Sequence, residues 1–418
     1  MSRPTSALVL APFLGALLAG CAAPGPAPGG AADSRSSTSA PVPSAAPTAE
    51  AQGPSPRLAV SHRDGVMVVD AATLEVVGGA ATTGFVRLNP AGDGRHVLVT
   101  QDDGWRVLDL GAWTEPHGDH GHSFTTTPRL TGTTIRGPHP GHVVVHGTRT
   151  TLFADGTGEM QVLDPDSLGA VDGSVDVVRH RAPAAHHGVA VTLPDGTLVH
   201  SLGTEEARTG AVALDVAGAE VARTDDCPGL HGEAVAAGDV VTLGCENGIL
   251  VYRDGRFTKV ASPTAYGRIG NQAGSERSGV VLGDYKVDED AELERPTRIS
   301  LVDTRTGRLR LVETGASYSF RSLERGPAGE ALVLGTDGRL RVVDPDTGVV
   351  TRSVPVVGPW REPVQWQDPR PAVRVVGDRA YVTEPSRSRL VAVDLTTGRL
   401  AGEATLPHVP NEIAGVAG

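Results

Sequence analysis

Aromatic residues are scarce in this sequence of 418 residues. They make up 4% of the chain, so the core has to be built mainly from Val, Leu and Ala. Positive charge is scarce as well, because 37 Lys and Arg face 49 Asp and Glu and leave a formal net charge of −12. A nucleic-acid-binding protein normally carries a basic surplus. The charge balance therefore argues against a nucleic-acid partner.

The sequence motifs of several enzyme classes are missing. The chain has no Gly-x-Ser-x-Gly nucleophile elbow, no phosphate-binding loop and no dinucleotide-binding fingerprint. Long stretches with helical spacing of apolar residues are also missing after Arg57. Gly (53) and Pro (31) are abundant, which favours a fold with many turns over a helical bundle.

The N-terminal segment predicts export. Residues 1–20 contain Arg3 and then a largely apolar run that is too short to span a bilayer but suits a signal peptide. The run ends in Leu-Ala-Gly-Cys, which resembles the lipobox of bacterial lipoproteins and makes Cys21 the expected lipidated N-terminus. An ordinary signal peptide with a chance cysteine is the alternative. We expect an extracytoplasmic protein whose only membrane contact is a lipid anchor at the outer face of the cell membrane.

Residues 21–56 are rich in Ala, Pro, Gly and Ser and contain few branched apolar side chains. Such a segment buries too little surface to offset its chain entropy, so it predicts a disordered tether. Residues 57–418 are expected to form the folded domain.

Within this domain, Cys227 and Cys245 are expected to pair, because the exported compartment is oxidising. A free buried pair is the alternative, whereas a metal role is disfavoured because no Cys-x-x-Cys spacing exists.

The sequence of the folded part contains a repeated unit. An apolar strand, a turn, a second strand ending near an Asp and a third strand recur eight times, as in "GVMVVDAATLEVVGG" and "SRLVAVDLTTGRLAGEA". The copies lie roughly 40–55 residues apart, which is the spacing of β-propeller blades. We therefore predict an all-β fold: a single β-propeller of eight blades, or seven with an insertion, each a four-stranded antiparallel sheet. The tail "PNEIAGVAG" is expected to close the ring against the strand that begins at Leu58.

Histidines gather in a few short segments of the domain. The sequences "PHGDHGH", "PHPGHVVVH", "AAHHGVAV" and "CPGLHGEAV" hold most of them. Imidazole suits zinc, which takes three or four nitrogen or oxygen donors in a tetrahedral site. The candidate ligands are His120, His122, His142, His187 and His231, and the additional candidates are His117, Asp119 and His186.

The spacing of three histidines is more informative than their number. His142, His187 and His231 each open the first strand of a candidate blade and are 45 and 44 residues apart. First strands line the channel of a propeller, so we expect these imidazoles to converge on one ion. The "PHGDHGH" segment is expected to be a loop that brings His120 or His122 over the same site as a mobile fourth ligand. A solvated surface run is the alternative interpretation of that loop.

These motifs together resemble the AztD-type zinc metallochaperones. The resemblance rests on "DHGH", "HHGVAV" and "CPGLHGEAV…GCENGILVY" in an exported propeller. It implies a disulfide between Cys227 and Cys245, zinc held by His-rich segments at one face, and delivery of zinc to the substrate-binding protein of a zinc ABC transporter. It also implies a protein that is not an enzyme, and we expect a monomer.

Two other classes of function stay open at this stage. One is a non-catalytic propeller that serves as an interaction or adhesion platform on the cell surface, which needs no ordered histidine cluster. The other is a propeller hydrolase or lactonase, which needs a metal held by Glu, Asn and Asp in the channel. The channel-facing candidates here are histidines, so the hydrolase reading is disfavoured.

Overall fold

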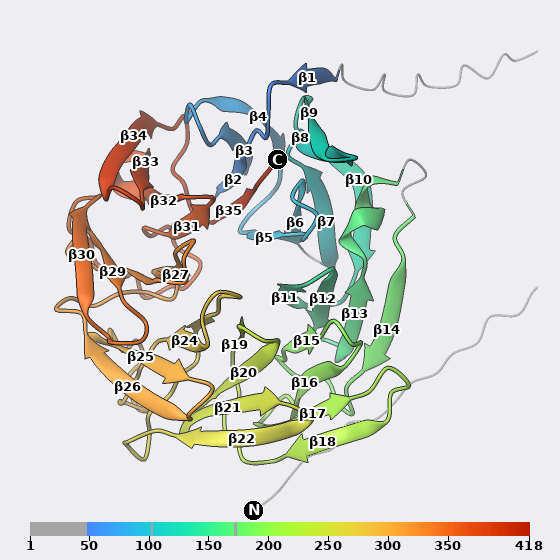
Figure 1. Cartoon of the computed structure of the whole chain (residues 1–418), viewed down its shortest axis with the longest axis vertical. Helices are drawn as coiled ribbons and strands as arrows, with labels where there is room; N and C mark the ends of the chain where they lie inside the picture. Colours follow the sequence, from blue (N-terminus) through green and yellow to red (C-terminus); the bar gives the residue numbers. More distant parts are fainter. Residues whose placement is uncertain (1–47, 102, 171–173) are drawn as a thin grey trace, which may run out of the picture. The chain divides into compact units, whose positions relative to one another are not determined.

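The computed structural model describes residues 48–101, 103–170 and 174–418 (Figure 1). The signal peptide, Cys21 and most of the tether lie outside the described residues and stay predictions. The described residues belong to one compact unit, which spans 46–418. No helix in the described part of the chain is long and apolar enough to cross a bilayer.

The described residues form eight four-stranded antiparallel sheets and one three-stranded sheet. Figure 1 shows the four-stranded sheets following one another around a ring in chain order. Two short 3-10 turns, at Pro165–Gly169 and Pro385–Arg387, are the helical elements of these residues. The prediction of an all-β propeller with four-stranded antiparallel blades is confirmed.

The first four sheets lie in the N-terminal half of the ring. They comprise β35 (Ile413–Val416), β2 (Arg57–His62), β3 (Gly65–Asp70) and β4 (Val76–Ala81); β5 (Arg87–Pro90), β6 (His96–Gln101), β7 (Gly104–Asp109) and β10 (Arg129–Arg136); β11 (Pro140–His146), β12 (Arg149–Ala154), β13 (Glu159–Leu163) and β14 (Val177–Arg181); and β15 (Ala190–Thr192), β16 (Leu198–Gly203), β17 (Arg208–Leu214) and β18 (Glu220–Thr224).

The other four sheets complete the ring. They comprise β19 (Glu233–Ala236), β20 (Val240–Cys245), β21 (Gly248–Arg253) and β22 (Arg256–Ala261); β23 (Gln272–Ala273), β24 (Val280–Gly283), β25 (Arg298–Asp303) and β26 (Arg308–Glu313); β27 (Leu323–Arg325), β28 (Ala331–Leu334), β29 (Arg339–Val343) and β30 (Val350–Pro355); and β31 (Val373–Val376), β32 (Arg379–Glu384), β33 (Arg389–Asp394) and β34 (Arg399–Thr405).

The two ends of the domain share one sheet. β35 pairs antiparallel with β2, so that Arg57 lies opposite Val416 and Val60 opposite Ile413. The predicted closure by the C-terminal tail is confirmed. Closure matters because it removes the two free sheet edges that an open array would expose.

The recurring Asp marks the turn from the third to the fourth strand of a sheet. The carboxylate of Asp394 accepts hydrogen bonds from the backbone N–H and the hydroxyl of Thr397, and Asp70 accepts from Ala72 and Thr73. An Asp that bonds the backbone two or three residues ahead stabilises a tight turn. In these two sheets the sequence repeat is therefore a turn signal, and it falls at the outer edge of the sheet.

The core lies between neighbouring sheets rather than at one centre. Val199 of β16, for example, packs in one cluster with Val241 and Leu243 of β20, all of them without solvent exposure. Most buried side chains are Val, Leu and Ala, as the shortage of aromatics requires. Each sheet is fixed by its two neighbours, so the inner strands hold their positions around the channel.

Strand structure begins before the predicted domain boundary at Arg57. β1 (Ala49–Ala51) pairs antiparallel with β9 (His120–Thr125), which in turn pairs with β8 (Ala112–His117). The end of the segment expected to be a disordered tether thus forms part of a three-stranded sheet. The hairpin β8–β9 is inserted between β7 and β10, and the open edge of β9 forms backbone hydrogen bonds with β1.

Candidate metal site

Three histidines meet at the start of three consecutive sheets. His142 lies in β11, His187 precedes β15, and His231 precedes β19. One ligand atom from each lies within 4.8 Å of the others, and the three ring centroids are 5.2–5.8 Å apart. The structure therefore brings together the three residues whose spacing in the sequence predicted convergence. We call them the triad.

Each imidazole of the triad is held from behind through its Nδ1 atom. His187 Nδ1 lies 2.5 Å from Asp155 Oδ2, and His231 Nδ1 lies 2.7 Å from the carbonyl oxygen of Gly270. His142 Nδ1 lies 2.9 Å from Glu233 Oε2. Partners of this kind fix the orientation and tautomer of a metal-binding imidazole and raise its basicity. The Nε2 atoms are left as the nitrogens that can bind a metal.

These contacts decide where the protons lie. Carboxylate and carbonyl oxygens accept hydrogen bonds, so Nδ1 of His187 and of His231 carries the proton of the neutral ring. Each Nε2 then presents a lone pair, and the two Nε2 atoms are 3.3 Å apart. Two lone pairs this close repel unless a cation lies between them. The arrangement is therefore suited to a bound proton or a metal ion.

The separation also matches the size of a zinc site. With Zn–N bonds of about 2.0–2.1 Å, two ligands of a tetrahedron are about 3.3 Å apart. The 3.3 Å between His187 and His231 meets this requirement without movement. Three imidazoles leave the fourth position of a tetrahedral ion open.

Burial and charge act differently on two members of the triad. Burial, the largest single cause, lowers the pKa of His142, but the charge and the hydrogen bond of Glu233, together with the charge of Asp155, raise the pKa above its ordinary value. Burial and the charge of His142 hold the pKa of His231 well below its ordinary value. A proton taken up by the metal-free triad therefore goes to His142 before His231.

The triad opens into a cavity of about 850 Å³. Its wall combines polar side chains with a few aromatic ones. The lining residues beyond the triad include Phe85, Arg87, Asn89, Asp155, Glu233, Arg268, Asn271, Gln272, Asp284, Lys286, Phe320 and Trp366. The side chain of His187 is 43% exposed and that of His142 23%, so a small ion can reach the site from the cavity.

Sequence reasoning missed the residues that support the triad. Asp155, which lies behind His187, and Glu233, which lies against His142 on another sheet, had no predicted role. Asp284 had no predicted role either, and it is 5% exposed. It accepts hydrogen bonds from the N–H groups of Gly270 and Asn271, and so fixes the peptide that bonds His231. An acidic residue just after an apolar strand is the signal that could have revealed Asp155 and Asp284.

A second group of histidines lies on the β8–β9 hairpin. His117, His120 and His122 have ligand atoms within 4.8 Å of one another, and we call them the hairpin cluster. His120 and His122 are two residues apart in β9 and therefore lie on the same face of the strand. His117 lies directly opposite His120 in β8. The expected loop is instead a hairpin with Gly118 and Asp119 at its tip, where Gly118 takes a positive φ of 62°.

The hairpin cluster repeats the pattern of the triad. His120 Nδ1 lies 3.2 Å from Asp119 Oδ1, and His122 Nδ1 lies 3.0 Å from Glu50 Oε1 on β1. Their Nε2 atoms are 3.2 Å apart. Asp119 thus lies behind an imidazole rather than beside the converging nitrogens. Glu50 was assigned to the tether by the sequence and had no predicted role.

Two expectations about the site need correction. His120 and His122 do not join the triad, because their hairpin pairs with β1 and groups them with His117 instead. His186 is 2% exposed, and both of its ring nitrogens have partners, the carbonyl oxygen of Ala184 and the hydroxyl of Ser201. Its buried ring packs edge-on against Phe153, so it supports the core.

The disulfide lies next to the triad. Cys227 and Cys245 are bonded, with their Cα atoms 5.0 Å apart. The bond ties the segment before β19, which has no regular strand structure, to the end of β20. The backbone N–H of His231 then bonds the carbonyl oxygen of Gly244 at 3.0 Å. The expected disulfide is confirmed, and it restrains the segment that carries His231.

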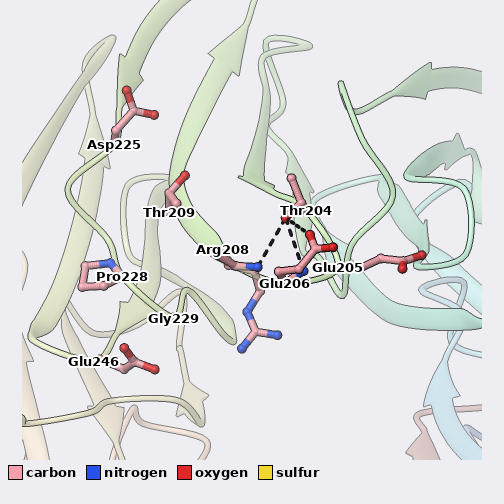
Figure 2. Close-up of a pocket in the computed structure, with 10 residues that line it drawn as sticks. Thr204, Glu205, Glu206, Arg208, Thr209, Asp225, Pro228, Gly229 and Glu246 are labelled. Carbon is pink, nitrogen blue, oxygen red and sulfur yellow. Dashed lines mark hydrogen bonds between the residues drawn. The ribbon is translucent and has the colours of Figure 1, made fainter. Parts of the chain in front are cut away.

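Another hollow lies beside the same disulfide (Figure 2). Its volume is about 550 Å³, and its wall holds Thr204, Glu205, Glu206, Arg208, Asp225 and Glu246 among others. Dashed lines in Figure 2 mark the bonds of the Thr204 hydroxyl, which include one of 2.7 Å to Glu206. The lining residues include no histidine, so this hollow lacks the donors of the triad.

The chain is similar to a characterised metal carrier. It is 27% identical over 365 residues to "Zinc chaperone AztD" of Citrobacter koseri, covering 84% of both chains. The crystal structure of Citrobacter koseri AztD matches with a TM-score of 0.74 and 27% identity over 88% of this chain and 99% of that one. The apo form matches with a TM-score of 0.73 and 26% identity over 87% and 98%. The resemblance inferred from the motifs is confirmed.

Other comparisons add the fold alone. The dihydro-heme d1 dehydrogenase NirN matches with a TM-score of 0.55 and 15% identity over 86% of this chain and 74% of that chain. No model of a known protein family matches the sequence. The role of a zinc chaperone, as AztD is named, is non-enzymatic, which agrees with the expectation that this chain is not an enzyme.

Proposed function

We propose that this chain is an extracytoplasmic zinc chaperone that holds zinc at the triad. The observation that carries the proposal is the meeting of His142, His187 and His231, with paired lone-pair nitrogens at the ligand spacing of a tetrahedral zinc ion. The similarity to the zinc chaperone AztD supports the same metal. Zinc is the cargo of the protein, and the open fourth position gives it a way in and out.

The fit of zinc rests on the donor set. Neutral imidazole nitrogen is a preferred zinc donor, and three such donors with one open position form an exchangeable site. Calcium and magnesium prefer oxygen donors and are disfavoured here. Cys227 and Cys245 are bonded to each other and offer no thiolate.

The hairpin cluster is proposed as a second, more accessible zinc site. Its side chains are 57% exposed at His120 and 43% at His122, and they come from neighbouring strands rather than from separate sheets. A partner protein can reach this cluster directly. We infer that it acts in the transfer of zinc more than in its storage.

The receiving partner is proposed to be the substrate-binding protein of a zinc ABC transporter. Anchoring through Cys21 at the outer face of the cell membrane would keep donor and acceptor in the same compartment. A tether reaching to the first described residues would let the propeller move over the membrane surface. We expect the propeller to act as a monomer and to bind no nucleic acid.

Zinc titration of the purified protein tests this function. The expected result is tight binding that is lost in a variant with all three triad histidines replaced by Ala. Transfer is then measured by mixing the zinc-loaded protein with the metal-free substrate-binding protein and following zinc in each after separation. If the protein binds no zinc, the interaction platform becomes the better interpretation. If zinc reaches the partner no faster than it dissociates from this protein into solution, the protein is not a chaperone.

A further inference from the structure

Two cations face each other on the cavity wall beside the triad. Arg268 and Lys286 form an isolated antiparallel bridge and exchange two backbone hydrogen bonds of 2.9 and 3.0 Å. Residues directly opposite in such a pair have Cβ atoms about 4.5–5.5 Å apart, and like charges at this separation repel. Both residues line the cavity into which the triad opens.

The counter-charges of this pair are incomplete. The Arg268 guanidinium lies 3.6 Å from Glu246, which is a loose contact. Among the described residues, no carboxylate lies within 4 Å of the Lys286 ammonium. The charge of the buried Asp284 on the same wall acts on both cations, but it forms no ion pair within 4 Å with either. An anion that enters the cavity therefore meets cations without a close carboxylate partner.

Arg268 also lies against the backbone that holds the metal ligand. A Cβ at Gly270 would be 2.9 Å from Arg268 Nε, so the guanidinium packs against the Cα of this glycine. The carbonyl oxygen of the same Gly270 accepts the hydrogen bond of His231 Nδ1. The cation and the imidazole thus meet at one residue of the cavity wall.

Zinc would leave the cavity with excess positive charge. The wall carries equal numbers of carboxylates and permanent cations, which are Asp155, Glu233, Asp284, Arg87, Arg268 and Lys286. The triad contributes neutral imidazoles when it binds zinc. The two charges of the ion are then unbalanced in a space lined partly by aromatic rings, and a bound charge without a counter-ion is costly away from bulk water.

We propose that the cavity binds a small carboxylate anion together with zinc. One carboxylate oxygen fills the fourth position of the zinc ion, and the other accepts hydrogen bonds from Lys286 and Arg268. A carboxylate suits this role because its two oxygens serve both partners at once, and arginine presents a planar fork of donors to it. The inference rests on the proposed function, since it needs zinc at the triad.

The test measures zinc affinity with and without acetate. Zinc is titrated against a competing chelator at constant pH and ionic strength, in sodium acetate of about 20 mM or in sodium perchlorate as the weakly coordinating control. If the anion binds the zinc form at about a tenth of that concentration, the zinc affinity rises about tenfold. Acetate in solution binds zinc weakly and acts in the opposite direction, so a rise cannot come from the buffer.

Variants assign the effect to the cation pair. Lys286→Gln and Arg268→Gln are expected to bind zinc but to lose most of the acetate effect, whereas Lys286→Arg restores it. Arg256→Gln removes the same charge from an exposed residue outside the cavity and is expected to keep the full effect. The visible absorption of Co²⁺ bound in place of zinc reports the same event, because acetate in the fourth position changes the ligand field.

The outcomes separate this inference from the proposed function. Loss of all zinc binding in the wild type would remove both. Zinc affinity and Co²⁺ spectra that do not respond to acetate would remove the anion site and leave the zinc site intact. An acetate effect that persists in Lys286→Gln and Arg268→Gln would also overturn the proposal, because the cation pair would then have no part in it.

Discussion

The triad and the hairpin cluster each consist of three histidines, but they lie in opposite settings. The triad draws one histidine from each of three consecutive sheets and opens into a cavity, whereas the hairpin cluster draws all three from two paired strands at the surface. In both, an acceptor behind each of two rings turns their Nε2 atoms toward each other, 3.3 Å apart in one and 3.2 Å in the other.

The difference lies in what holds the ligands in place. The triad depends on the relative position of three sheets, which is fixed by the apolar side chains packed between them. The hairpin cluster depends on one hairpin and on the short strand β1 that pairs with it. We expect the triad to bind zinc tightly because its geometry is formed in advance, and the hairpin cluster to exchange zinc quickly.

Removing one ligand from each group separates the two sites most strongly. His231→Ala is expected to weaken zinc binding at the triad, the tighter site, at least about a hundredfold. Loss of a residue that only supports a metal ligand typically costs about 10–100-fold, and His231 is itself a ligand. His122→Ala is expected to leave that equilibrium within about threefold and to slow the transfer of zinc to the partner protein. The two are compared by chelator competition and by stopped-flow transfer. Equal losses of affinity in the two variants would show that the groups are not distinct sites.

Neutralising the carboxylates behind the triad tests the role of its support. Glu233→Gln and Asp155→Asn each keep the size of the side chain and are expected to weaken zinc binding at the triad about 10–100-fold. Asp284→Asn keeps an oxygen that can accept from Gly270 and Asn271, so its loss is expected to be smaller. Glu205→Gln, in the hollow of Figure 2, is the matched control. An effect of Glu205→Gln as large as that of Glu233→Gln would point to general charge rather than to support of the triad.

Removing the disulfide should affect the two sites unequally. The double variant Cys227→Ser and Cys245→Ser frees the segment that carries His231, and the free energy of unfolding is expected to fall by about 3 kcal/mol. Zinc affinity at the triad should fall while binding at the hairpin cluster is unchanged, because the hairpin lies on a different sheet. Denaturant unfolding and zinc titration check both effects. Full triad affinity in the double variant would show that strand packing alone positions His231.

Acid should release zinc from the triad in a way that Glu233 controls. An imidazole binds metal when it is neutral, and the pKa of His142 is raised above about 6.5. As the pH is lowered, the zinc affinity therefore begins to fall while the pH is still above about 6.5. In Glu233→Gln, burial is no longer opposed by the charge of Glu233 and lowers the pKa of His142, so the loss of zinc affinity moves to lower pH even though binding at pH 8 is weaker. For the metal-free protein, the raised pKa stabilises the fold below about pH 6.5, and this contribution is lost as the pH rises through that pKa. Zinc titrations between about pH 5 and 8 distinguish these shifts from an unchanged profile, which would exclude Glu233 as the cause.

The sequence predicted the propeller and the triad because both follow from periodicity. The Asp-centred turns recur once per sheet, and residues at equal places in consecutive repeats are neighbours around the channel, so His142, His187 and His231 had to meet. The hairpin was harder to predict because "PHGDHGH" contains two glycines and no β-branched residue, although Gly118 and Asp119 suit a tight turn. The acceptors behind the rings of the triad were missed because each lies in a different segment of the chain from the histidine that it supports. Glu233 lies two residues from His231 yet supports His142, and only the folded ring shows it.

The position of bound zinc is the most direct test of the account. Crystals of the protein with one equivalent of zinc would be measured on both sides of the zinc absorption edge. We expect an anomalous difference peak about 2.0–2.1 Å from Nε2 of His142, His187 and His231, with Nδ1 of each still facing its acceptor. A peak found only at His117, His120 and His122, or bonded through Nδ1 atoms of the triad, would contradict the claim that three sheets of the ring together build the zinc site.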